Sequence, residues 1–168
     1  MPTDVLISPE EYLHTSFPDL DKEYVHGEIV ERGLPDLSHS KTQLRFCLIL
    51  SRLTAAHKLF PFPELRLRLE ARVVRIPDVS VFLGREPVQQ VPNHPPFIAI
   101  EIVSEDDRYP NILKKLEEHR RFGVTHIWLV DPRLMRLSEY GETGLREVKA
   151  FLLPDFDLKI TLADLGLC

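Results

Sequence analysis

The stretch that decides the fold is residues 75–107, RIPDVSVFLGREPVQQVPNHPPFIAIEIVSEDD. Two segments in it, 79–83 and 97–103, are continuous apolar runs, which are typical of strands that are covered on both faces. Yet Asp78 lies at the edge of the first run and Glu101 lies inside the second. Glutamate is seldom fully buried without a partner. The stretch therefore predicts a buried sheet with a polar site built into it.

Helical patterns precede and follow these two strands. The segment SPEEYL at 8–13 carries a capping box, with Ser8 as the cap and Glu11 three residues later. The segment at 106–122 is predicted to be a longer helix that Gly123 ends.

A third helix is predicted over 38–60, with Ser38 or Ser40 as its cap and with Pro61 and Pro63 ending it. The apolar residues expected near one face of this helix are Leu44, Cys47, Leu48 and Leu53.

The remaining segments are predicted to be strands. Residues 64–75 alternate as a half-buried strand, and 125–131 is a further buried strand. Hairpins are expected at 23–33 and 136–152, and 158–165 closes the chain. Strands with interspersed helices predict an α/β (α+β) fold, with a central mixed sheet flanked by helices.

The length of 168 residues suits one domain, spanning 1–168. The formal net charge is −5, which argues against a protein that binds DNA by charge alone. It argues less against a metal-dependent nuclease, because a bound cation offsets clustered carboxylates. Cys47 and Cys168 form no disulfide framework, and we find no secretion signal or membrane-spanning run, so a cytoplasmic protein is expected.

A metal ion is one remedy for buried carboxylates, which are costly without a partner. If the strands that carry Asp78 and Glu101 pair, their side chains converge. Two hard oxygen ligands, with water and a substrate phosphate, suit Mg²⁺. The main-chain carbonyl of Ile102 is a candidate third ligand.

The helix after Glu101 carries a polar stripe. Asn111, Lys115 and His119 are spaced at i, i+4 and i+8, so they share one side of the helix. If the apolar side packs on the sheet, the edge of this stripe overhangs the two carboxylates. Lys115 would then orient a water or stabilise the charge that develops on a phosphate.

Three ordered motifs make the chain recognisable: IPDVSVF at 76–82, FIAIEIVSEDD at 97–107 and LKKLEEHRRFGVTHIWLVDP at 113–132. Together they resemble a bacterial restriction endonuclease family of the PD-(D/E)XK nuclease superfamily. In that family a P-D pair, an E-V-x-S strand end, a helical lysine and a further strand recur in this order. With YVHGEIVERG at 24–33, the resemblance covers about residues 8–165.

The resemblance implies a restriction-endonuclease-like fold and roles for particular residues. Asp78 and Glu101 would be metal ligands, and Lys115 would be the catalytic lysine. The superfamily's usual lysine position holds Val103 here, and in this family the lysine stands on the following helix instead. Glu28 corresponds to a family glutamate and would support the acidic site.

The expected reaction is Mg²⁺-dependent hydrolysis of DNA phosphodiester bonds, with Mn²⁺ as a substitute ion and a homodimer as a compatible assembly. The main alternative is a weakly active or inactive nuclease-fold module that binds nucleic acid or protein. A third interpretation is a structural domain in which Glu101 merely forms a salt bridge with Arg75 or Lys115. His39 matches a histidine of the family and is either a helix-start residue or a phosphate contact.

Overall fold

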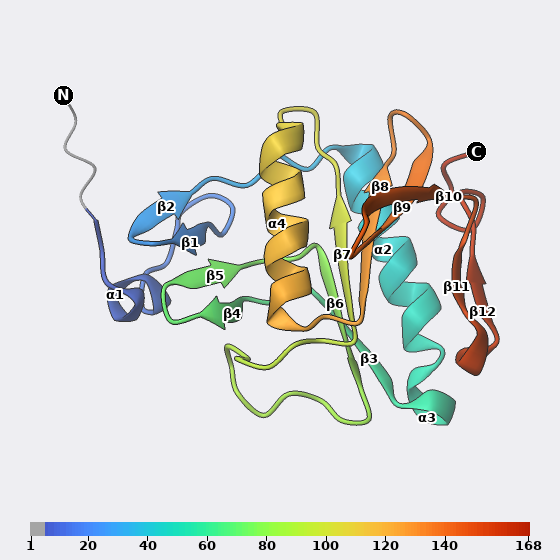
Figure 1. Ribbon diagram of the computed structural model, residues 1–168, viewed down its shortest axis with the longest axis horizontal. Helices are drawn as coiled ribbons and strands as arrows, with labels where there is room; N and C mark the ends of the chain where they lie inside the picture. The colour runs from blue at the N-terminus through green and yellow to red at the C-terminus, as the bar shows by residue number, and fades with distance from the viewer. Residues whose placement is uncertain (1–5) are drawn as a thin grey trace.

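The central sheet has six strands in the order β10-β9-β8-β7-β6-β3 (Figure 1). The structure is a computed structural model that describes residues 6–168. The six strands are β3 (Leu59–Pro63), β6 (Val79–Leu83), β7 (Ile98–Ile102), β8 (His126–Asp131), β9 (Arg136–Gly141) and β10 (Gly144–Val148). β7 and β8 are parallel and the other neighbours are antiparallel. The sheet is therefore mixed, as the sequence predicts.

Helices cover both faces of this sheet. The helical elements are α1 (Pro9–Leu13), α2 (Leu37–Ser51), α3 (Thr54–His57), α4 (Tyr109–Phe122) and the short 3₁₀ helix η1 (Pro154–Phe156). Along β7, Ile98 and Ile100 pack with Phe46 of α2, whereas Ala99 packs with Leu116 of α4. Successive side chains of a strand point to opposite faces. Glu101 therefore shares the α4 face with Ala99.

A second sheet adjoins α4 and has the order β2-β1-β5-β4 (Figure 1). Its strands are β1 (Glu23–Val25), β2 (Glu28–Val30), β4 (Leu67–Glu70) and β5 (Val73–Arg75). The predicted hairpin at 23–33 is confirmed. The single strand predicted at 64–75 is wrong, because the chain turns at Ala71 and Arg72 and the two halves pair antiparallel. A two-stranded sheet of β11 (Phe151–Leu153) and β12 (Leu158–Ile160) completes the strands of residues 6–168.

The helix predicted over 38–60 is shorter than expected. The cap of α2 is Asp36, whose side chain accepts a hydrogen bond from the His39 amide, so neither Ser38 nor Ser40 caps it. The helix ends at Ser51, before the two prolines, which lie in β3.

The predicted buried face of α2 is also wrong in part. The fully buried apolar residues are Phe46 and Leu50, while Leu44 and Leu48 are 58% and 47% exposed. The helix carries more apolar residues than one face holds, so periodicity alone does not select the buried set.

The predicted cap of α1 and the predicted end of α4 are confirmed, while α4 begins at Tyr109, three residues later than the predicted segment. Ser8 and Glu11 form both hydrogen bonds of the capping box at the start of α1. Gly123 ends α4 with a φ of 102°, in the left-handed region that glycine adopts without a steric penalty. No helix within residues 6–168 has the length and apolar content that a membrane span requires.

Candidate active site

Asp78 and Glu101 lie opposite each other on neighbouring strands. The register pairs Val79 with Ile100, and one further antiparallel step places Asp78 across from Glu101. Their exposed fractions are only 5% and 6%. Both line one cavity of about 370 Å³. The convergence predicted from the sequence therefore depends on this strand register.

Two cationic or polar side chains from α4 contact Glu101. The ammonium of Lys115 donates to Oε2 at 2.9 Å, and Nε2 of His119 lies 3.0 Å from Oε1. Burial alone raises the pKa of the Glu101 carboxyl, but Lys115 and His119 outweigh burial and lower the pKa to about 2. Glu101 is therefore an anion throughout the neutral range.

The predicted polar stripe of α4 spans the depth of the site. Asn111 is exposed at the mouth of the cavity, the Lys115 side chain is 20% exposed, and His119 is completely buried. Lys115 and His119 of the stripe therefore contact Glu101, as expected, while Asn111 lines the entrance of the cavity.

Glu23, which sequence reasoning missed, is the second carboxylate at Lys115. Its Oε1 lies 3.2 Å from the Lys115 ammonium, and Glu23 is 2% exposed. Burial alone lowers the pKa of Lys115, but Glu101, Glu23 and Asp78 raise it, and the net pKa lies above the ordinary value. Lys115 is therefore held as a cation between two sheets, because Glu23 lies on β1 and Glu101 on β7.

A buried arginine fixes Glu23. Arg75 donates to Glu23 Oε2 at 2.8 Å and binds Glu118 of α4 at 2.6 Å through its Nε atom. The amide of Ile76 donates to the other Glu23 oxygen at 2.9 Å. Of the two partners proposed for Glu101 in a salt bridge, Lys115 pairs with it, and Arg75 pairs with these other acids. In the sequence, an arginine two residues before the P-D pair, directly after Val73 and Val74, was the available signal for a second buried acid.

Asp78 is held by groups from three directions. Oδ2 accepts the amide proton of Ile102 at 2.7 Å, and Oδ1 lies 3.2 Å from Nε2 of His39 and 3.3 Å from Nη2 of Arg32. Burial alone lowers the pKa of His39, but the contact with Asp78 outweighs it, and the net pKa is raised. The helix-start residue His39 thus supports the carboxylate.

Glu28 and Ile102 both line the cavity. Glu28 is an exposed residue of β2, so it lies on the rim rather than against Glu101. The atom of Ile102 that contacts Asp78 is its amide nitrogen, and the carbonyl as a metal ligand stays a prediction.

The donor set suits a hard divalent cation that keeps part of its water shell. Within residues 6–168, no three His, Cys, Asp or Glu side chains form a ready metal cluster. Magnesium commonly binds through only one or two carboxylates together with substrate phosphate and water. Asp78 and Glu101, both lining one cavity from adjacent strands, fit that requirement.

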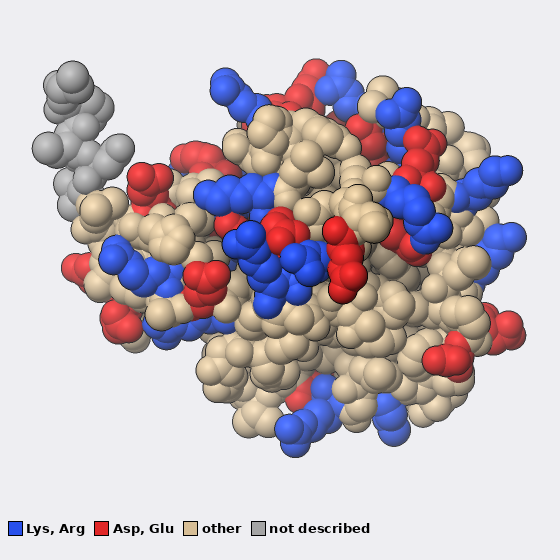
Figure 2. Space-filling view, viewed as in Figure 1, with Lys and Arg blue, Asp and Glu red and all other residues tan. Residues whose placement is uncertain are grey.

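The surface around α4 carries both signs of charge. Figure 2 shows acidic and basic side chains side by side over this helix. Glu117, for example, pairs with Arg120 and Arg121 at 2.8 and 3.0 Å. This face therefore offers no broad basic surface.

A family model matches most of the chain. Residues 9–160 match the Uma2 family, which is described as "Putative restriction endonuclease". The chain belongs to the Uma2 family. As a Uma2 member it is also similar to a solved structure, "Crystal structure of a putative nuclease belonging to DUF820 from Anabaena variabilis ATCC 29413". No curated protein sequence matches this Uma2 chain.

The structural match covers 95% of this chain and 97% of the solved chain, with a TM-score of 0.83 and 23% sequence identity. At this identity the likeness shows the fold alone. It agrees with the restriction-endonuclease-like fold expected for the Uma2 chain, a mixed sheet flanked by helices. Membership of the family supports a nuclease.

Proposed function

We propose that the chain is a Mg²⁺-dependent endonuclease that hydrolyses DNA phosphodiester bonds. One observation carries the proposal: Asp78, Glu101 and Lys115 line a single cavity in a member of a family described as restriction endonucleases. Two buried carboxylates can hold a metal ion, and a neighbouring ammonium can stabilise negative charge on a phosphoryl group.

Asp78 and Glu101 would hold the ion, with the Ile102 carbonyl as a further ligand and Mn²⁺ as a substitute ion. A bound ion supplies Lewis acidity toward a phosphoryl oxygen and toward water. The protein's own contribution is to fix the two carboxylates. The Ile102 amide and His39 hold Asp78, and Lys115 and His119 hold Glu101.

Lys115 acts as a positioned cation in this proposal. Its ammonium donates a hydrogen bond to Glu101 and can oppose negative charge or position a water for deprotonation. Glu101 accepts a hydrogen bond from it at 2.9 Å, and Glu23 forms an ion pair with it at 3.2 Å. The ammonium can therefore orient a water molecule or stabilise the charged phosphoryl group without reorganising. Glu28, on the rim, would support the site through solvent.

The second candidate is a nuclease-fold module that binds nucleic acid or protein without cutting. It is favoured by the internal pairing of both carboxylates, since Asp78 already contacts Arg32 and Glu101 already contacts Lys115. In that case the ion pairs would serve stability, and divalent cations would leave the protein unchanged.

A combined cleavage and melting experiment separates the two candidates. Wild-type protein should nick supercoiled plasmid in Mg²⁺, and millimolar Mn²⁺ should raise its Tm by mass action. Asp78→Asn should lose both effects, while Asp155→Asn, at an exposed position in η1, should keep both. If the wild-type protein shows neither cleavage nor a Tm shift, the nuclease proposal is refuted. A Tm shift without cleavage would favour the binding module.

A further inference from the structure

Arg32 is a basic side chain of the cavity that the proposed chemistry does not use. It lies between β2 and α2, its side chain is 8% exposed, and it lines the same cavity as Asp78 and Glu101. Its Nη2 atom approaches Asp78 at 3.3 Å and Glu64 at 3.6 Å. Among residues 6–168, its buried Nη1 atom has no hydrogen-bond partner.

These contacts are poor compared with the other ion pairs of the site. Arg75 meets its acids at 2.6 and 2.8 Å, and Lys115 meets Glu101 at 2.9 Å. A buried charged donor without an acceptor destabilises the folded state. Arg32 is therefore placed against Asp78 without satisfying the hydrogen-bonding capacity of its guanidinium.

The backbone around Arg32, by contrast, is fixed. A Cβ atom added to Gly33 would lie 2.6 Å from Cβ of Ser104, so the two segments are in close contact. The Leu34 amide donates to Asp106 at 3.3 Å on the same loop. The main chain is thus held beside the site. A change of ion-pair partner would therefore involve the Arg32 side chain and not the backbone.

We infer that Arg32 is a phosphate-binding residue of the site, which pairs with Asp78 when that carboxylate holds no divalent cation. This inference rests on the proposed function. If Asp78 held a divalent cation, the net positive charge there would repel the guanidinium, and Arg32 would lose its attraction to Asp78. The planar fork of arginine matches two oxygens of a phosphodiester, which would satisfy both terminal nitrogens.

The inference predicts opposite effects on two ligands. Replacing Arg32 with alanine should weaken binding of a short fluorescein-labelled DNA duplex by about tenfold to a hundredfold, measured by anisotropy with Ca²⁺ in place of Mg²⁺. The same change should strengthen Mn²⁺ binding by about tenfold in calorimetric titration, because a competing cation leaves Asp78. A purely structural role would weaken both.

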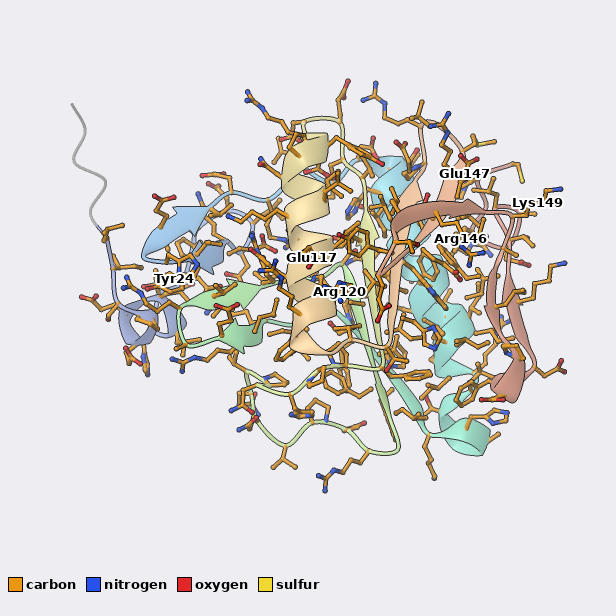
Figure 3. The ribbon with its side chains drawn as sticks, viewed as in Figure 1. Tyr24, Glu117, Arg120, Arg146, Glu147 and Lys149 are labelled. Carbon is orange, nitrogen blue, oxygen red and sulfur yellow. The ribbon has the colours of Figure 1, made fainter. Side chains whose placement is uncertain are left out.

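Two further variants make the result decisive. Arg32→Lys keeps a positive charge near Asp78 but lacks the fork, so it should fold and still lose most of the duplex affinity. Arg146→Ala removes an arginine on the β10 side of the molecule, where Figure 3 labels it, and should bind both ligands as the wild type does.

The outcomes are distinguishable. If the wild type binds the duplex and both Arg32 variants bind it equally well, the assignment of Arg32 is refuted and the nuclease proposal survives. Weakened Mn²⁺ binding in Arg32→Lys would also refute it. If the wild type binds neither duplex nor Mn²⁺, the proposed function itself fails.

Discussion

The charge of Glu101 should make a measurable contribution to stability. Its pKa is lowered from an ordinary 4.5 to about 2, a difference worth about 3 kcal/mol in favour of the folded state. The carboxyl is only 6% exposed, so solvent screening reduces this value little. Because the folded pKa lies below the unfolded one, the stabilisation is fully present above about pH 5. It is lost as the pH falls toward about 2.

Glu101→Gln tests this reasoning by removing the charge while keeping the shape. In EDTA, urea unfolding at about pH 6 should show the variant less stable than the wild type by about 3 kcal/mol. At about pH 2.5 most of that difference should disappear, because the unfolded carboxyl is then almost fully protonated and the pH lies close to the folded pKa of about 2.

Glu117→Gln is the matched control. Glu117 lies on α4 and its pKa is also lowered to about 2, chiefly by hydrogen bonds from Arg120. Its side chain is 28% exposed, against 8% for Glu101, so solvent screening predicts a much smaller change in stability at either pH. A difference between wild type and Glu101→Gln that stays the same from about pH 6 to about pH 2.5 would refute the electrostatic argument.

Three other changes follow from the same geometry. Lys115→Met should reduce plasmid cleavage by at least about a hundredfold. It should also destabilise the fold by about 3 kcal/mol, because Glu23 and Glu101 are left without their shared cation. Cleavage at the wild-type rate by a folded variant would contradict the role given to Lys115. The raised pKa of His39 stabilises the fold below its unfolded pKa of about 6.5, and this contribution is lost as the pH rises through the higher folded value. His39→Gln should therefore be less stable than the wild type at about pH 5.5 and closer to it at about pH 9, and an equal loss at both pH values in urea melts would exclude the charged contact. Gly33→Ala should destabilise the protein by about 1–3 kcal/mol, because the added methyl group meets Ser104 at 2.6 Å, and an unchanged Tm would show that the two segments separate easily.

The sequence predicts those parts of the fold whose signals are local. The capping box at Ser8 and the terminating Gly123 are each set by a few neighbouring residues, and both are found where expected. The buried face of α2 is different, because Leu44 and Phe46 are equally apolar and only the tertiary packing makes one exposed and the other buried.

The candidate site divides in the same way. Asp78 and Glu101 stand out in the sequence because each interrupts or borders an apolar strand. Glu23 does not, since β1 is a three-residue strand that resembles a surface hairpin. Its burial comes from pairing with β5, which brings Arg75 alongside, and that register is a long-range property. Arg32 was missed for a similar reason, because it lies outside any regular element.

Lys115, held between Glu23 and Glu101, couples its ammonium position to the placement of the small sheet. One acid belongs to the small sheet and the other to the central sheet, so the ammonium position reports the separation of two independently hydrogen-bonded layers. An insertion in the β1–β2 or β4–β5 turn that tilts the small sheet would displace the ammonium without altering any residue of the central strands. The small sheet thus helps to set the position of the Lys115 ammonium, and substitutions far from the cavity can shift it.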